Sequence, residues 1–231
     1  IMRIILVCLT AMAFPVGTAA APPNVVLILA DDLGWTDLGC YGSDFYETPN
    51  LDKLARDGMK FTQNYSACCV CSPTRGAILT GKYPARTHCT DWIPGRVPNN
   101  AKLLPPPGWI PRLPADELTV ASSLRNAGYE TASLGKWHLG EFNTIGNGFN
   151  TNIGGTDAGS PSSYFAPWKI ATLQPEGMLG EYLTDRITDE ACGWITANKA
   201  KPFFLFLPHF AVHSPIEAPA SLVAKYKGKL P

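Results

Sequence analysis

Three strand-like runs, separated by helix-like segments, most strongly constrain the fold of this 231-residue chain. Residues 24–30 read NVVLILA, residues 129–134 read YETASL, and residues 202–208 read PFFLFLP. The first and third runs are almost wholly apolar, which is typical of strands buried on both faces of a parallel sheet. Because helical segments alternate with the runs, the sequence predicts an α/β sandwich around a mostly parallel central sheet.

Capping and stop signals locate the other elements. A Thr-Pro start and a Gly exit predict a helix over residues 48–58, and similar signals predict the remaining helices. The predicted helices cover residues 48–58, 73–81, 119–127 and 179–198, a further strand covers 59–65, and long loops cover 96–114 and 143–161.

Composition narrows the class of protein. A hydrophobic content of 45% with 16% charged residues indicates a globular chain rather than a disordered one. The 19 basic residues balance the 19 acidic ones, so charge gives no indication of a nucleic-acid partner.

The first residues resemble an export signal. Residues 1–21 combine Arg3, an apolar core and small residues at the expected cleavage site, which predicts a signal peptide. No later stretch is long enough to predict a transmembrane segment. We therefore expect an exported protein, periplasmic or extracellular, or lysosomal or secretory in a eukaryote.

Polar side chains follow each of the three strand-like runs. Asp31 and Asp32 follow the first, Lys136 and His138 the second, and His213 the third. In parallel sheets, ligands bind beyond the carboxyl ends of the strands, so these side chains are expected to meet at one edge. This placement predicts an active site there.

The adjacent carboxylates of Asp31 and Asp32 predict a cation. Two neighbouring carboxylates repel each other unless a cation lies between them, and oxygen ligands suit calcium or magnesium. A solvated turn before Gly34 is the alternative explanation.

The segment Cys71-Ser72-Pro73-Thr74-Arg75 stands before a predicted helix. Free backbone N–H groups at a helix start attract anions, and an arginine there adds a bidentate donor. A surface arginine paired with an acid is the alternative for Arg75. The seven cysteines permit disulfides in an exported protein, but the sequence assigns no pairs and shows no zinc spacing.

Lys136 and His138 stand two residues apart after a strand. In extended geometry both side chains point to the same side, and an anion between them would relieve their repulsion. A histidine buried in the core is the alternative for His138, and the same alternative applies to His213.

Five segments in order resemble the type I sulfatase family. They are NVVLILADDLGW, ETPNLDKLARDG, CSPTRGAILTGKYPAR, LGKWHLG and PHFAVHSP. The resemblance implies an alkaline-phosphatase-like fold and hydrolysis of sulfate monoesters, of either a sulfated small molecule or a sulfated carbohydrate. It also implies that a formylglycine-generating or sulfatase-maturing enzyme oxidises Cys71 to formylglycine, whose hydrate is the nucleophile.

The resemblance also implies a role for each site residue. Asp31 and Asp32 would bind Ca²⁺ together with an oxygen of the modified Cys71. Arg75 would orient the hydrate, and Lys136 would contact sulfate. His138 would accept a proton from the hydrate, and His213 would lie near the leaving-group oxygen.

Members of this family run to roughly twice the present length and place further metal ligands and a lysine downstream. We therefore expect residues 22–231 to be the N-terminal portion of a sulfatase catalytic domain, an incomplete fragment with the C-terminal part of the fold missing. Two alternatives remain. One is a phosphonate or phosphate ester hydrolase of the same superfamily, and the other is a non-catalytic secreted domain on a sulfatase scaffold.

Overall fold

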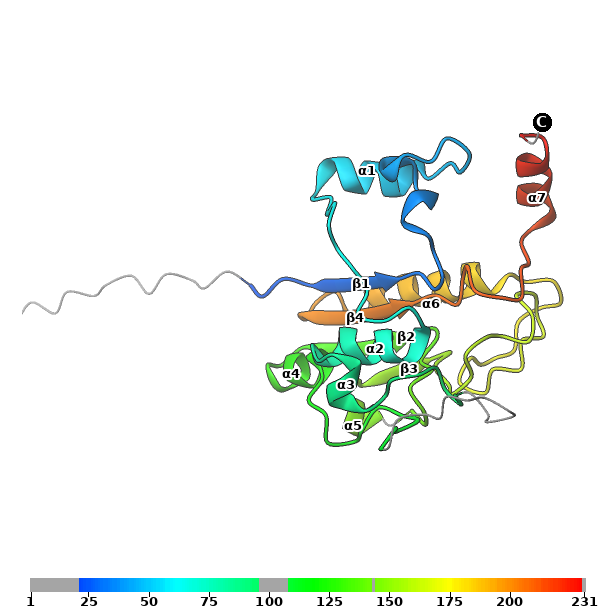
Figure 1. The fold of residues 1–231 in the computed structure, drawn as a ribbon. Helices are drawn as coiled ribbons and strands as arrows, with labels where there is room; N and C mark the ends of the chain where they lie inside the picture. The colour runs from blue at the N-terminus through cyan, green and yellow to red at the C-terminus, as the bar shows by residue number, and fades with distance from the viewer. Residues whose placement is uncertain (1–20, 96–107, 143, 230–231) are drawn as a thin grey trace, which may run out of the picture.

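A four-stranded parallel sheet forms the centre of the protein in the computed structural model, which describes residues 21–95, 108–142 and 144–229 (Figure 1). The strand order is β1-β4-β2-β3, and each strand is parallel to its neighbour. The prediction of a parallel α/β sheet is confirmed. The strands are β1 (Val25–Leu29), β2 (Glu130–Leu134), β3 (Thr151–Ile153) and β4 (Phe203–Pro208).

Helices surround this sheet. The predicted helices over residues 48–58 and 119–127 are confirmed, and the latter is capped by Thr119, whose Oγ1 accepts a hydrogen bond from Ser122 N at 3.0 Å. The α-helices are α1 (Pro49–Asp57), α2 (Cys71–Thr80), α3 (Pro84–Thr87), α4 (Val120–Asn126), α5 (Thr144–Asn147), α6 (Leu183–Asn198) and α7 (Ala220–Lys227), with short 3₁₀ turns η1 (Trp35–Asp37) and η2 (Gly39–Tyr41).

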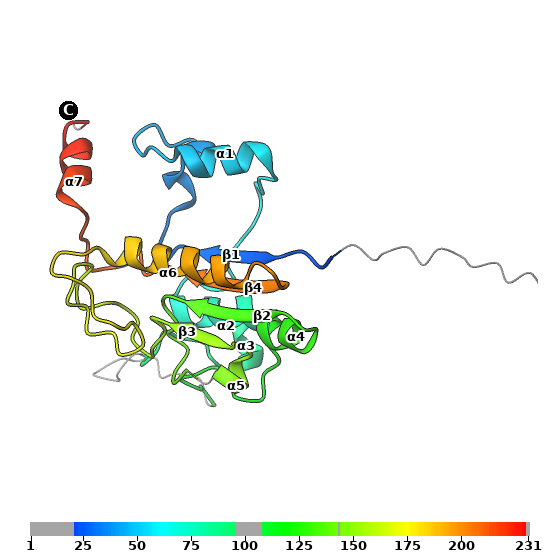
Figure 2. The same cartoon turned by 180° about the vertical axis from the view of Figure 1, so that it is seen from behind.

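Strand β4 is buried on both faces, as its apolar run predicts. Phe203, Leu205 and Leu207 pack with Leu183 and Ile187 of α6. The alternate residues face the opposite way, into a cluster that contains Leu79 of α2 and Ala121 of α4. In Figures 1 and 2, α6 accordingly covers one face of the sheet, and α2 and α4 lie on the other. The members of the second cluster are Leu79, Leu113, Ala121, Trp137, Leu139, Phe149, Phe204 and Phe206.

Strand β1 departs from the expectation of burial on both faces. Val26 and Ile28 are 44% and 58% exposed, although Val25, Leu27 and Leu29 pack against the core on the other face. Among the described strands β1 lies at an edge of the sheet, and α6 packs over β2 and β4, to one side of it. One apolar face of β1 is therefore uncovered within the described residues.

The strand predicted over residues 59–65 is wrong. Met59, Phe61 and Tyr65 alternate as in a strand, but they are 77%, 61% and 80% exposed and no described strand pairs with them. Lys60 Nζ instead donates a hydrogen bond to the carbonyl of Cys40 at 2.9 Å. Alternation alone does not make a strand when no neighbouring strand is available for pairing.

Three other boundaries differ from prediction. The expected loop over residues 143–161 contains α5 and the short strand β3, whose pairing with β2 compensates for its polar sequence. Helix α2 begins at Cys71 rather than Pro73. Helix α6 begins at Leu183 rather than residue 179, since Gly180 adopts a left-handed φ of 85° just before it.

The predicted signal peptide over residues 1–21 lies, apart from its last residue, outside the described residues. Within the described ranges, no helix has both the length and the apolar character needed to cross a lipid bilayer.

Candidate active site

Asp31 and Asp32 leave the carboxyl end of β1 beside the exit of β4. Asp31 N donates to the carbonyl of Ala211 at 2.9 Å, and Val212 N donates to the carbonyl of Asp31 at 2.7 Å. Asp32 has a left-handed φ of 59°, which aspartate tolerates better than most residues. This geometry buries the Asp31 side chain and leaves that of Asp32 61% exposed.

Asp31 is the centre of a buried charge cluster with Lys136 and Arg75. Lys136 Nζ donates a hydrogen bond to Asp31 Oδ2, and Arg75 Nη2 lies 3.3 Å from Asp31 Oδ1. Arg75 Nη1 also donates to the carbonyl of Lys136 at 2.7 Å. All three side chains are nearly inaccessible to solvent. Two buried cations share one buried carboxylate, so the cluster carries a net positive charge.

This excess of positive charge indicates an anion-binding site. Burial lowers the pKa values of Arg75 and Lys136, and the adjacent Asp31 carboxylate opposes that shift for both. Arg75 Nε and Nη2 are buried and make no hydrogen bond within the described part of the chain. Buried donors without acceptors are costly, so these groups suit a bound oxyanion.

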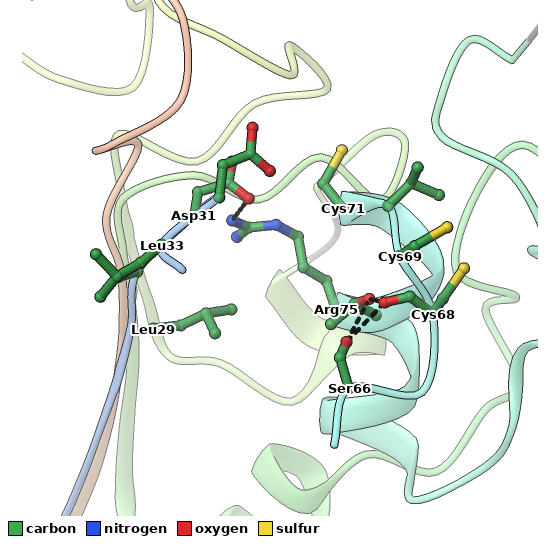
Figure 3. A pocket seen from close by; sticks show the side chains of 12 residues that line it. Leu29, Asp31, Leu33, Ser66, Cys68, Cys69, Cys71 and Arg75 are labelled. Carbon is green, nitrogen blue, oxygen red and sulfur yellow. Dashed lines mark hydrogen bonds and ion pairs between the residues drawn. The ribbon is translucent and has the colours of Figure 1, made fainter. Parts of the chain in front are cut away.

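Cys71 is the first residue of α2 and lies at the same cavities as Asp32. A cavity of about 340 Å³ is lined by Asp31, Asp32, Cys71 and Arg75, and an adjoining one of about 440 Å³ by Asp32, Cys71 and His138. Figure 3 shows the Arg75 guanidinium directed at Asp31, and the Cys68 and Cys69 sulfurs turned away from both. Cys68 and Cys69 also line the first cavity, but among these three cysteines it is Cys71 whose thiol acts electrostatically on Arg75 and Lys136.

The turn after β2 places Lys136 and His138 differently from expectation. The chain does not stay extended, because Gly135 and His138 have φ values of 121° and 55°. A Cβ on Gly135 would lie 2.1 Å from the carbonyl oxygen of Pro208, so only glycine fits where β2 leaves the sheet. Lys136 consequently reaches across β4 to Asp31, whereas His138 Nε2 hydrogen-bonds the carbonyl of Ile93 at 2.5 Å.

The imidazole of His138 is neutral near neutral pH. Its side chain is buried, and this burial lowers its pKa from 6.5 to about 4, with Lys136 and Arg75 adding to the shift. A neutral imidazole carries one lone pair that can accept a proton. His138 is therefore a buried histidine, as the alternative expectation had it, and it also lines the second cavity.

His213 follows β4 and also lines the second cavity. Its Nε2 lies 3.7 Å from Asp32 Oδ2, and its Nδ1 donates to the carbonyl of Ser214 at 2.9 Å. The buried Tyr164 donates its hydroxyl proton to the carbonyl of His213 at 2.8 Å. Nε2 is thus the ring nitrogen on the side of Asp32, which lines the same cavity.

The described residues fit a hard cation in part. Asp31 and Asp32 present carboxylate oxygens to one cavity, the donor type that calcium prefers. No cluster of three or more His, Cys, Asp and Glu side chains within the described ranges is arranged to hold a metal ion. These two residues would therefore supply only part of a ligand set.

All six cysteines in the described part of the chain are free thiols. Cys89 is fully buried, and burial is the main cause that raises its pKa to about 11. A thiol with so high a pKa is unreactive at neutral pH. The disulfides that export would permit are thus not formed among these residues, and Cys8 lies outside the described range.

Several functional positions were missed in the sequence. The carbonyl of Ile93, the close approach of Gly159 to His138, and the contact from Tyr164 to His213 all come from loops. A backbone carbonyl has no sequence signature, and Gly159 resembles any other glycine of a polar loop. Only their place in the fold identifies them.

A parallel α/β sheet with charged and imidazole groups at its strand ends, taken together with the solved structures that share its fold, places this protein in the alkaline-phosphatase-like class. The family model "Sulfatase" matches residues 23–231, and the chain belongs to the sulfatase family. The N-acetylgalactosamine-6-sulfatase of Canis lupus familiaris is 35% identical over 239 residues, which are 93% of this chain and 44% of that protein. The steryl-sulfatase of Mus musculus is 47% identical over 134 residues, covering 58% and 20% of the two chains.

Solved structures agree with this assignment. Ps i-CgsB in complex with k-i-k-neocarrahexaose superposes with a TM-score of 0.71 at 28% identity, over 91% of this chain and 49% of that one. BT4656, in complex with its substrate D-glucosamine-2-N,6-O-disulfate, gives 0.70 at 27% identity, over 91% and 39%. A phosphonate monoester hydrolase of Agrobacterium radiobacter, at 21% identity and 0.60, shares the fold. The chain spans less than half the length of the curated relatives described above.

Proposed function

We propose that this protein hydrolyses sulfate monoesters at the cavities lined by Cys71. The observation that carries the proposal is the buried cluster of Arg75, Lys136 and Asp31, whose net positive charge and buried Arg75 Nε, a donor with no acceptor among the described residues, suit a sulfate group. Electrostatic stabilisation of an anionic transition state requires such preorganised donors. Membership of the sulfatase family supports the same activity.

We propose that the nucleophile derives from Cys71, by its oxidation to formylglycine. Cys71 stands in the Cys-x-Pro-x-Arg pentapeptide, begins α2 and lines both cavities. A formylglycine hydrate would supply an oxygen nucleophile together with a second hydroxyl that can lose its proton. An unmodified thiol offers neither group, so unconverted protein is expected to be nearly inactive.

Asp31 and Asp32 are the candidate ligands of a calcium ion, joined by an oxygen of the modified Cys71. When bound, the ion would supply positive charge that polarises a sulfuryl oxygen. The exposed carboxylate of Asp32 and the left-handed turn that carries it face the cavity shared with Cys71. No third His, Cys, Asp or Glu side chain of the described residues is arranged to join them.

The remaining residues bind the sulfate and move protons. Arg75 and Lys136 would contact the sulfuryl oxygens from the buried side of the cavity. His138, which is neutral, would accept a proton from the nucleophile, and His213, which lines the same cavity, would serve the leaving-group oxygen. The two histidines come from different elements, the turn after β2 and the segment after β4, so different groups would remove and deliver the protons.

The substrate class proposed here is a sulfated carbohydrate, with a sulfated small molecule as the alternative. The matched relatives named above include enzymes named for or crystallised with sulfated sugars. We further propose that residues 22–231 form the N-terminal portion of the catalytic domain. The protein would be exported and would meet its sulfatase-maturing enzyme on the way.

Peptide mass spectrometry tests the modification. The tryptic peptide from Phe61 to Arg75 contains Cys71, and oxidation of thiol to aldehyde lowers its mass by about 18 units. The protein is co-expressed with a formylglycine-generating enzyme, and Cys71→Ala serves as the control. Recovery of only the unmodified thiol would reject the proposed nucleophile.

Parallel assays on an aryl sulfate and an aryl phosphate test the reaction class. We expect the higher kcat/KM on the sulfate. A higher kcat/KM on phosphate would favour a phosphate or phosphonate hydrolase. Absence of turnover on either ester by fully converted, full-length protein would favour a non-catalytic domain.

A further inference from the structure

Two consecutive hydrogen bonds connect the residue after Cys71 with His138. Ser72 is fully buried on the first turn of α2, and its Oγ accepts a hydrogen bond from Ile93 N at 3.1 Å. The carbonyl of the same residue, Ile93, contacts Nε2 of His138 at 2.5 Å. The N–H and the C=O of Ile93 belong to successive peptide groups joined at its Cα, so this one residue in the loop after α3 connects the start of α2 to the imidazole.

This contact determines the tautomer of His138. A carbonyl oxygen can only accept a hydrogen bond, so Nε2 must carry the proton. The lone pair of the neutral ring then resides on Nδ1, which makes no hydrogen bond within the described residues. The hydrogen bond made by one ring nitrogen of a histidine commonly determines whether the other nitrogen carries the free lone pair.

The other contact of the imidazole is steric and does not select a tautomer. A Cβ added to Gly159 would lie 2.6 Å from Cε1 and 2.7 Å from Nε2 of His138, so the loop backbone packs directly on the ring. This packing limits the position of the ring, but it contributes no hydrogen bond to either nitrogen. The orientation of the Nδ1 lone pair therefore depends on the Ile93 carbonyl.

We propose that Ser72 is a positioning residue, which holds the backbone of Ile93 through its N–H so that the Ile93 carbonyl keeps the proton of His138 on Nε2 and its lone pair on Nδ1. The proposal deepens the function proposed above and rests on it. In that reaction Nδ1 accepts the proton lost by the nucleophile, which gives an imidazolium whose Nε2–H still donates to Ile93. The proton then passes from Nδ1 to solvent and restores the neutral ring.

The substitution Ser72→Ala isolates this role, because it preserves the Cys-x-Pro-x-Arg pentapeptide. Thr74→Ala is the matched control. Thr74 occupies the other variable position of the pentapeptide on the same helical turn, and its hydroxyl donates to the carbonyl of Cys68 at 2.8 Å. Thr74→Ala removes two hydroxyl hydrogen bonds, with Cys68 and with Ser66, and Ser72→Ala removes one, but only Ser72 is connected to His138. The Phe61–Arg75 peptide mass confirms equal conversion of Cys71.

The first readout is the tautomer of His138, measured by long-range ¹H–¹⁵N NMR on the full chain at neutral pH. We expect the Nε2–H form in wild type and in Thr74→Ala, and a mixture of both forms in Ser72→Ala. An Nδ1–H form in wild type would overturn the proposal without any variant, as would an unchanged tautomer in Ser72→Ala. This readout needs no turnover, so its failure is distinguishable from failure of the proposed reaction.

The second readout is turnover of an aryl sulfate by the full chain co-expressed with a formylglycine-generating enzyme. We expect Ser72→Ala to lower kcat by about tenfold with little change in KM, since only a proton-transfer group is displaced. Ser72→Thr retains the acceptor hydroxyl and should recover most of the loss. An equal decrease in Thr74→Ala, or no recovery by threonine in a folded variant, would assign Ser72 a merely structural role.

Discussion

Lys136 and Asp31 form a buried ion pair between two strand exits, although 105 positions separate them in the sequence. Strand β4 lies between β1 and β2, and the turn at Gly135 lets the lysine cross it. Arg75 reaches the same carboxylate from α2. Three elements thus meet at one aspartate, which makes the anion site dependent on the whole sheet.

Removal of the Asp31 charge should therefore be more damaging than removal of the Lys136 charge. Asp31→Asn leaves two buried cations without their carboxylate and should lower the free energy of unfolding by about 3–5 kcal/mol. Lys136→Met should cost less, because Arg75 still faces the carboxylate. Urea unfolding measures both. Equal losses in the two variants would contradict the shared-carboxylate arrangement.

Lys53→Met provides the exposed control for this comparison. It removes a surface ion pair with Asp57 in which the two side chains are 67% and 49% exposed. Such a pair contributes less than about 1 kcal/mol, so its loss should scarcely change the urea midpoint.

Gly159→Ala should displace the imidazole of His138. The new methyl group would lie 2.6 Å from Cε1, so either the ring or the loop must move. We expect a lower kcat on an aryl sulfate with a smaller change in stability. Gly193→Ala is the control, because a Cβ there meets no atom within 4 Å and alanine favours the helix. An unchanged kcat in Gly159→Ala would contradict this prediction, because it would show that the loop moves to accommodate the methyl group and leaves His138 in place.

The burial of neutral His138 predicts a loss of stability in acid. Its pKa is about 4 in the folded protein against 6.5 for the ordinary side chain. The stability that depends on a neutral His138 is fully present above about pH 6.5. It declines as the pH falls toward 4, because between these two values His138 takes up a proton in the unfolded chain but not in the folded protein. The decline should total about 3 kcal/mol. Urea unfolding from pH 7 to 4 should show a flatter pH profile in His138→Gln, and parallel profiles would refute the assignment.

Tyr164→Phe tests how the His213 loop is held. The hydroxyl of Tyr164 donates to the carbonyl of His213 at 2.8 Å, and its loss leaves that carbonyl without this donor. We expect about 1 kcal/mol lower stability and about tenfold lower kcat. Tyr182→Phe is the matched control, since its hydroxyl contacts the carbonyl of Glu217 at 3.3 Å. Similar kcat losses in both variants would point to general loosening of the loop.

Much of the central sheet was predictable from local pattern. The apolar runs of β1 and β4, and the helix signals around Thr48 and Thr119, are local patterns, so they can be recognised without knowledge of the tertiary contacts. Residues 59–65 and strand β3 were misassigned for the opposite reason. A strand forms only where a neighbouring strand supplies hydrogen bonds, and no local pattern records that neighbour.

The candidate site, like the fold, was predictable from the sequence only in part. The sequence by itself determined which side chains follow the strands, Asp31, Lys136 and His213 among them, because parallel strands bring their carboxyl ends to one edge. Only the tertiary structure decided how they pair: that Lys136 crosses β4 to Asp31, and that His138 turns to the carbonyl of Ile93. These pairings depend on left-handed turns and on close approaches between distant loops, whose energies arise only once the chain is packed.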